Sequence, residues 1–103
     1  MNIAIAATSP EADAQVDQHG ARAPYYQFFD TGTGLTEVLP NPVSKNERGA
    51  GPQAAAFLIS RGADKVVAGD FGQRFSDELE EAGIVRIQKT GAISAVVSDN
   101  RQL

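Results

Sequence analysis

Two glycines, Gly62 and Gly83, each separate a helix-forming segment from a short run rich in β-branched residues. The segment before Gly62, PQAAAFLISR, starts with a proline suited to a first helical turn and continues with alanines that favour a helix. Glycine readily adopts the left-handed conformation that ends many helices, and the strand-like runs DKVVAG and IVRIQ follow the two glycines. This repeated order predicts strands joined by helices in an α/β fold.

The segment before Gly83, DFGQRFSDELEEAG, has one apolar face. Its Phe71, Phe75, Leu79 and Ala82 recur at spacings of four, four and three residues, and most of its acidic residues lie opposite. We therefore expect an amphipathic helix that packs on the sheet and ends at Gly83.

The N-terminal part of the chain predicts a first strand and a hairpin. NIAIAAT places two isoleucines on one face and alanines on the other, so that a helix can approach the alanine face closely. YYQFFD and LTEVLP lie on either side of TGTG, which is typical of a β-hairpin. A mixed sheet covered by helices is expected, in one domain that spans residues 1–103.

The tail TGAISAVVSDNRQL is compatible with two structures. Ile93, Val96 and Val97 fit a helical stripe, whereas the β-branched content favours a strand. Periodicity alone leaves both open.

The chain has no cysteine, which excludes disulfides, thiolate zinc sites and cysteine-held iron–sulfur clusters. A formal net charge of −4 without a basic tract argues against nucleic acid as a partner. No apolar run approaches the roughly 20 residues of a membrane helix, and the N-terminus has no signal-peptide pattern. We therefore expect a cytoplasmic protein with no nucleic-acid or membrane partner.

Three loops carry both glycine and arginine: DQHGARAP, NERGAGP and AGDFGQR. Ligands of open α/β sheets bind beyond the carboxyl ends of the parallel strands, and helix N-termini there favour anions. The loops therefore predict an anion-binding cleft on an acidic protein. Each feature also has a plainer explanation, because glycines permit turns and a single arginine or histidine in a polar loop is often only solvated.

Residues for catalysis are sparse. The chain has a single histidine, no cysteine nucleophile and no G-x-S-x-G motif. Asp17, Asp30 and Asp70 have no spacing that defines an acid–base pair or a carboxylate cluster for a divalent metal. The sequence favours a binding protein that is not an enzyme.

Three stretches, HGARAPYYQFFD, GAGPQAAAFLISRGADKVVAGDFG and ELEEAGIVRI, together resemble the dinitrogenase iron-molybdenum cofactor-binding family. This family includes nitrogenase cofactor carriers of the NifX and NifB C-terminal type and the Orange protein of sulfate-reducing bacteria. The resemblance covers nearly the whole chain. It implies a ribonuclease-H-like α/β fold with a five-stranded mixed sheet and a helical tail.

The resemblance also implies a non-enzymatic carrier of a molybdenum-containing metal–sulfur cluster or its precursor. Such a cluster is of the Fe-Mo-S or Mo-Cu-S type, and in the Orange protein it is held without covalent protein bonds. Cluster donor and acceptor proteins would be the partners. An anionic thiometalate suits a cleft of arginines and backbone amides in a protein without cysteine.

On this resemblance His19 and Arg22 match the family's usual loop, which reads His-Phe-Gly-Arg-Ala-Pro, while Gly-Ala replaces its Phe-Gly pair. His19 is expected to be a metal ligand or hydrogen-bond donor, Arg22 and Arg48 charge partners, and the backbone amides near 49–51 and 69–72 an anion cradle. The altered loop motivates an alternative function, a protein-interaction or regulatory module that keeps the fold without binding a cluster. The candidate binding residues are His19, Gly20, Arg22, Arg48, Gly49, Gly51, Gly69, Asp70 and Gly72.

Overall fold

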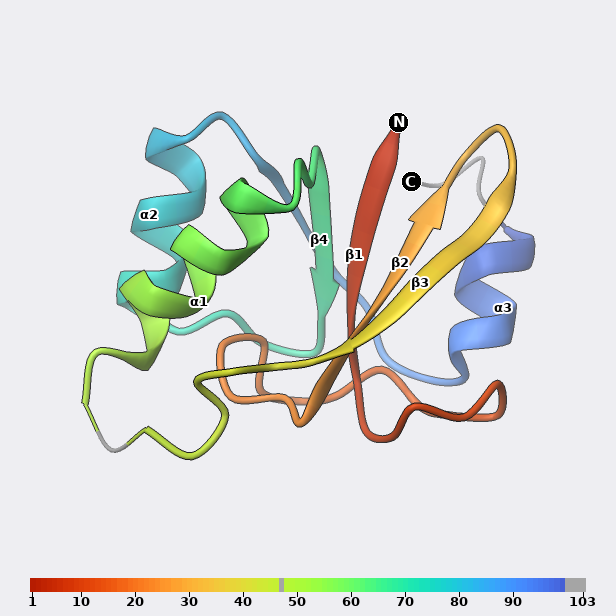
Figure 1. The fold of residues 1–103 in the computed structure, drawn as a ribbon, viewed down its shortest axis with the longest axis horizontal. Helices are drawn as coiled ribbons and strands as arrows, with labels where there is room; N and C mark the ends of the chain where they lie inside the picture. Colours follow the sequence, from red (N-terminus) through yellow and green to blue (C-terminus); the bar gives the residue numbers. More distant parts are fainter. Residues whose placement is uncertain (47, 100–103) are drawn as a thin grey trace.

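The structure, a computed structural model, describes residues 1–46 and 48–99. It contains a five-stranded sheet with helices on both sides, so the expected mixed sheet is confirmed (Figure 1). Residues 93–98 of the ambiguous tail form a short helix, as the family resemblance implied, and its last residues, 100–103, lie outside the described part of the chain. In chain order the elements are β1 (Asn2–Ala7), β2 (Tyr25–Asp30), β3 (Gly34–Pro40), α1 (Ala50–Ser60), β4 (Lys65–Ala68), α2 (Gln73–Glu81), β5 (Val85–Gln88) and α3 (Ile93–Ser98).

The strand order β3-β2-β1-β4-β5 brings the carboxyl ends of three strands to one edge. β1 pairs antiparallel with β2 and parallel with β4, which in turn pairs parallel with β5. β1, β4 and β5 therefore run in the same direction. The loops that follow β1 and β4 leave the sheet at this shared edge, where ligands of α/β folds commonly bind.

The alternation in β1 separates two apolar layers. Ala4 and Ala6 belong to the core formed with α1 and α2, whereas Ile3 and Ile5 belong to the core on the α3 side. Figure 1 shows α1 and α2 together on one side of the sheet and α3 on the other. The small alanines let the helices approach closely, as the sequence predicts, and Ala54 of α1 is completely buried in this layer.

The second helix starts later than the sequence suggests. Gly72, its N-cap, has φ 64° and ψ 158°, which no helix accommodates, so α2 begins at Gln73 and Phe71 lies outside it. Phe75 and Leu79 are buried as expected. Ala82, which was expected on the apolar face, follows the last helical residue and is exposed.

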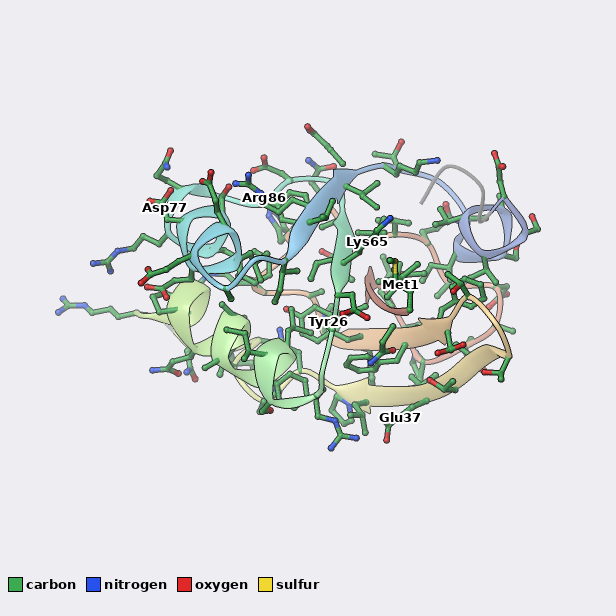
Figure 2. The ribbon with its side chains drawn as sticks, turned by 90° about the horizontal axis from the view of Figure 1, so that it is seen from above. Met1, Tyr26, Glu37, Lys65, Asp77 and Arg86 are labelled. Carbon is green, nitrogen blue, oxygen red and sulfur yellow. The ribbon has the colours of Figure 1, made fainter. Side chains whose placement is uncertain are left out.

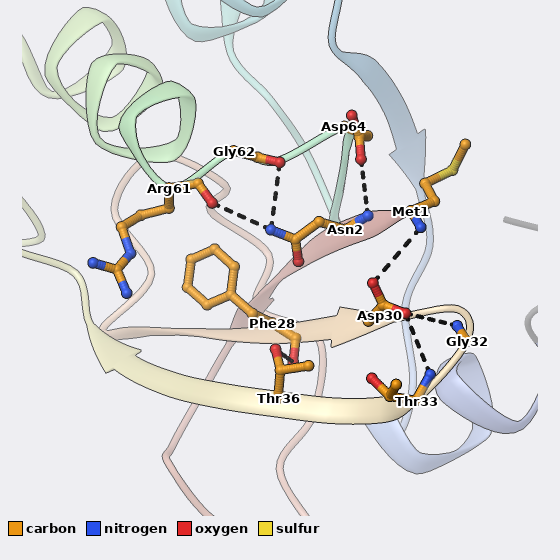
Figure 3. A network of polar contacts seen from close by, with 10 residues as sticks. All are labelled: Met1, Asn2, Phe28, Asp30, Gly32, Thr33, Thr36, Arg61, Gly62 and Asp64. Atoms are coloured by element: carbon orange, nitrogen blue, oxygen red, sulfur yellow. Dashed lines mark hydrogen bonds and ion pairs between the residues drawn. The ribbon is translucent and has the colours of Figure 1, made fainter.

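Polar contacts close the opposite edge of the sheet, where β1 begins (Figure 3). The Asn2 backbone N–H donates to the Asp64 carboxylate at 2.9 Å, and the Asp64 N–H donates back to the Asn2 carbonyl at 2.7 Å. The Asn2 side-chain amide donates to the carbonyls of Arg61 and Gly62 at 3.2 and 3.4 Å. These bonds join β1 to the end of α1 and to the start of β4. The polar groups at this edge of the sheet therefore stabilise the fold.

Asp30 stabilises the turn between β2 and β3 (Figure 3). The N–H of Gly32 donates to its carboxylate at 2.8 Å and that of Thr33 at 3.3 Å, while the N-terminal ammonium lies 3.7 Å away. The Gly32 N–H is the largest cause that holds the pKa of Asp30 below its ordinary value, with smaller contributions from the N-terminal ammonium and Thr33. The charged form is therefore favoured in the folded protein.

We expect Asp30→Asn to lower the free energy of unfolding at neutral pH and to have no such effect in acid. A carboxyl group with a lowered folded-state pKa stabilises the protein above its ordinary pKa, and this contribution disappears as pH falls through the folded-state value. Urea denaturation of both proteins over a pH series measures the difference. A difference that persists at the most acidic pH would show that the charge of Asp30 is not what holds the turn.

Candidate functional site

A pocket of about 170 Å³ lies at the edge of the sheet where β1 and β4 end. The loop after β1 forms one wall and the loop after β4 forms the other. Five of the nine residues predicted from the sequence line it. The lining residues are His19, Gly20, Ala21, Arg22, Asp70, Phe71 and Gly72.

Backbone hydrogen bonds hold the two walls together. The Asp17 N–H donates to the Ala6 carbonyl at 2.8 Å, which fixes the first loop to the end of β1. The Gly69 N–H donates to the Asp17 carbonyl and the Gly20 N–H to the Asp70 carbonyl, both at 2.9 Å. The segment 17–20 therefore runs like a short extra strand beside residues 69–70, beyond the ends of β1 and β4.

Glycine is required where these walls meet. A Cβ on Gly69 would lie 2.9 Å from the Gln18 Cα, and one on Gly20 would lie 2.9 Å from both the Asp70 carbonyl oxygen and the Phe75 ring. Real Cβ atoms do not come so close. The sequence suggested that Gly20 lets a ligand approach the loop and that the Gly69 amide forms part of an anion cradle. In the structure, each of these glycines instead allows the backbone of the opposite loop to come close, and its N–H donates to a carbonyl of that loop.

The pocket contains one cationic and one anionic side chain. Arg22 and Asp70 are both exposed, and the Arg22 guanidinium also donates to the Asn46 carbonyl, which ties the pocket to the segment before α1. His19 is exposed as well, while its backbone N–H donates to the Asp17 carboxylate at 2.8 Å. The His19 imidazole is therefore accessible from solvent at the pocket wall.

The remaining predicted residues lie outside this lining. Arg48 and Gly49 precede α1, and Gly51 lies in its first turn rather than in a loop. A Cβ on Gly51 would lie 2.9 Å from the Phe75 backbone nitrogen, so the lack of a side chain at Gly51 lets α1 and α2 pack closely where they cross. The expected amide cradle at 49–51 does not line this pocket, and its part in binding stays a prediction.

Phe71 is a pocket residue that the sequence assigned to the core. Its ring stacks on Phe75 with centroids 5.9 Å apart, and it remains partly exposed at the pocket. Helical spacing placed it on the apolar face of α2, although the next residue, Gly72, breaks the helix. The loop Asp70–Gly72 also borders a second, more polar hollow of about 370 Å³ that is lined further by Gln73, Ser76 and Gln88.

Tyr26 supports the pocket from inside the protein. It lies between the sheet and α1 (Figure 2). Its ring stacks on Phe57 with centroids 6.2 Å apart. Its hydroxyl donates to the Gly20 carbonyl at 2.6 Å. Burial raises the pKa of Tyr26 far above its ordinary value, and the Asp17 carboxylate adds to this shift. The hydroxyl therefore remains a donor throughout the working pH range.

Over residues 1–46 and 48–99, no three or more His, Asp or Glu side chains are grouped so that they could hold a metal ion. The same residues include no helix that is both long and apolar enough to cross a membrane. The site instead combines an imidazole, a guanidinium, a carboxylate and an aromatic ring around backbone amides. Such a site suits a ligand held by hydrogen bonds and charge rather than by several side-chain metal bonds.

Residues 1–102 match the family described as dinitrogenase iron-molybdenum cofactor. The chain belongs to the dinitrogenase iron-molybdenum cofactor family. The expected family membership is thereby confirmed. No curated protein sequence matches the chain.

Solved structures share this fold over almost the whole chain. The apo form of the orange protein from Desulfovibrio gigas has 28% sequence identity and a TM-score of 0.87, with 98% of this chain and 87% of that chain covered. The protein PH0822 has 27% identity and a TM-score of 0.82, with 97% and 89% covered. A Thermotoga protein described as a NifB candidate of the DUF35 family has 24% identity and a TM-score of 0.82, with 98% and 87% covered, and supports the fold alone.

We expect Gly69→Ala to destabilise the protein by about 2 kcal/mol, in the range found for overpacked interiors. The added methyl group would collide with the Gln18 backbone and separate the two pocket walls. Gly32→Ala is the matched control, because only the exposed Asp30 carboxylate lies within 4 Å of its added Cβ, at 3.2 Å. Urea denaturation measures both variants. Equal, small losses for the two variants would contradict the close approach of the walls.

Proposed function

We propose that the protein is a non-enzymatic carrier of an anionic, molybdenum-containing metal–sulfur cluster, of the Fe-Mo-S or Mo-Cu-S type, or of its thiomolybdate precursor. The observation that carries this proposal is the pocket between His19–Arg22 and Asp70–Gly72 in a member of the iron-molybdenum cofactor family. The likeness to the orange protein of Desulfovibrio gigas supports it. The cluster is cargo that donor and acceptor proteins deliver and remove.

The residue types at the pocket agree with a cargo held without thiolates. The chain has no cysteine and offers no thiolate ligand, so the sulfur around the metals must belong to the cluster itself. The Arg22 guanidinium is a planar array of hydrogen-bond donors suited to a polyanion. The His19 imidazole is a donor when one ring nitrogen carries a proton, and its other nitrogen is a metal ligand when neutral. The Phe71 ring adds an apolar wall beside these polar groups.

Side-chain charge alone does not make the pocket cationic. Arg22 contributes one positive charge and Asp70 one negative charge, and both line the pocket. Preference for an anion must therefore also come from His19 and from oriented backbone peptides, which act as fixed partial charges.

We expect purified protein to bind tetrathiomolybdate with a change in visible absorption, and Arg22→Ala to weaken this binding about tenfold, as for loss of one charge-assisted hydrogen bond. Arg61→Ala is the matched control. Arg61 lies at the end of α1 and pairs with Glu37 at 2.7 Å, at residues that do not line the pocket. Equal affinities for the two variants would contradict the assignment of this loop.

Failure of the wild-type protein to bind any thiomolybdate would contradict cluster carriage itself. A protein-interaction or regulatory module that keeps the fold would then be the better interpretation. Retention of a partner from cell extract by immobilised protein, with no thiomolybdate response, would support that interpretation.

We expect Asp70→Asn to strengthen tetrathiomolybdate binding about fivefold, because it removes a like charge from the pocket wall in partly solvated surroundings. Asp77→Asn is the matched control, since Asp77 lies on α2 and accepts a hydrogen bond from Gln73 at 2.8 Å. Isothermal titration of the three proteins measures the change. Unchanged or weaker binding to Asp70→Asn would contradict the expectation that this carboxylate opposes an anion in the pocket.

A further inference from the structure

The carbonyl groups of the loop that forms one pocket wall point into the protein. The Tyr26 hydroxyl donates to the Gly20 carbonyl at 2.6 Å. The Asn41 side-chain amide donates to the carbonyls of Ala21 and Ala23, both at 2.9 Å. Three carbonyls within four residues are therefore held by two side chains from other parts of the chain.

Both of these side chains are fixed in place. Tyr26 has no exposed surface and Asn41 is only 4% exposed. The Asn41 side-chain oxygen accepts the Val43 N–H at 3.1 Å, and its backbone N–H donates to the Pro24 carbonyl at 3.0 Å. The Asn41 amide also reaches the Tyr26 hydroxyl at 3.5 Å. Side chains with so many partners and so little exposure have little freedom to move.

This arrangement sets the direction of the peptide dipoles. In a planar trans peptide the N–H points opposite to the carbonyl of the preceding residue. Because the Gly20 and Ala21 carbonyls face Tyr26 and Asn41, the N–H groups of Ala21 and Arg22 point to the other side of the loop. Gly20, Ala21 and Arg22 line the pocket, whereas Tyr26 and Asn41 do not.

We propose that Tyr26 and Asn41 are positioning residues of the binding site, which hold the 20–23 loop with the positive ends of its peptide dipoles toward an anionic ligand. The identity of the ligand rests on the proposed function, but the positioning of the loop does not. The opposing charges of Arg22 and Asp70 make such dipoles important. A loop of glycine and alanine would otherwise be mobile, and ordering it on binding would cost affinity.

Tyr26→Phe tests this proposal, because it keeps the buried ring and removes the hydroxyl that donates to the Gly20 carbonyl and accepts the long 3.5 Å contact from the Asn41 amide. Tyr25→Phe is the matched control. Tyr25 is the preceding residue of β2 and packs on the opposite face of the sheet, in the core beside α3. The two variants change the same atom on neighbouring residues, and only one of them contacts the pocket loop.

Two measurements are made on the wild type and both variants. The first is tetrathiomolybdate affinity, for which we expect a loss of about fivefold in Tyr26→Phe and no change in Tyr25→Phe. The second is the amide order parameter of Ala21 without ligand. We expect wild-type values typical of a rigid backbone, about 0.85, and a fall in Tyr26→Phe alone.

The two measurements separate failure of the positioning from failure of the proposed function. An unchanged Ala21 order parameter in Tyr26→Phe, or a wild-type value below about 0.6, would overturn the positioning role. The Ala21 order parameter of the wild-type protein tests the rigidity of the loop even if Tyr26→Phe does not fold. If the wild-type protein does not bind tetrathiomolybdate, and the Ala21 order parameter falls in Tyr26→Phe, the results would contradict cluster carriage while supporting the positioning role. Binding that is equally strong in both variants would overturn the role of the loop dipoles.

Discussion

The contact between the backbones of residues 17–20 and 69–70 is the constraint on which the pocket depends. Gly20 and Gly69 allow it, because a side chain at either position would meet atoms of the opposite wall at 2.9 Å or less. The backbone hydrogen bonds between residues 17–20 and 69–70 extend the parallel pairing of the sheet beyond the ends of β1 and β4. The pocket walls are therefore attached to the most buried part of the fold rather than to mobile loops.

The two ends of the sheet serve different purposes. At the start of β1, Asn2 and Asp64 bond to each other and to the end of α1, and side chains satisfy the exposed backbone groups. At the carboxyl end, α1 and α2 both begin after glycines without a side-chain cap. The positive N-terminus of α2, whose N-cap Gly72 lines the pocket, thus faces the same edge as the imidazole and guanidinium, which suits an anionic ligand.

The order of elements and the two apolar layers follow from the sequence, because each depends on local patterns. Gly62 and Gly83 end helices in the left-handed conformation, and the alternation of isoleucine and alanine in β1 assigns its two faces correctly. The tail differs, since Ile93, Val96 and Val97 have helical spacing whereas its β-branched content favours a strand. The burial of Ile93 and Val96 beside Ile3 and Ile5 is a tertiary contact that periodicity does not encode.

The site was only partly predictable for the same reason. His19, Arg22 and Asp70 stand out as polar residues in glycine-rich loops at the edge where the pocket lies, but the sequence does not say which glycines contact protein and which contact solvent. Phe71 had the spacing of a core residue, and only the backbone of Gly72 reveals that it leaves the helix. The Tyr26 hydroxyl reaches a carbonyl six residues away, and the Asn41 amide reaches carbonyls 20 and 18 residues away, which no local pattern records.

The most direct test of a cluster site at this edge is amide chemical-shift mapping of the wild-type protein during titration with tetrathiomolybdate. We expect shifts concentrated at residues 19–22 and 70–72, with little change around Asn2, Asp30 and Asp64 at the opposite edge. Shifts centred on that opposite edge or on the exposed strand β3, or no shifts at all, would contradict a cargo pocket between the two loops.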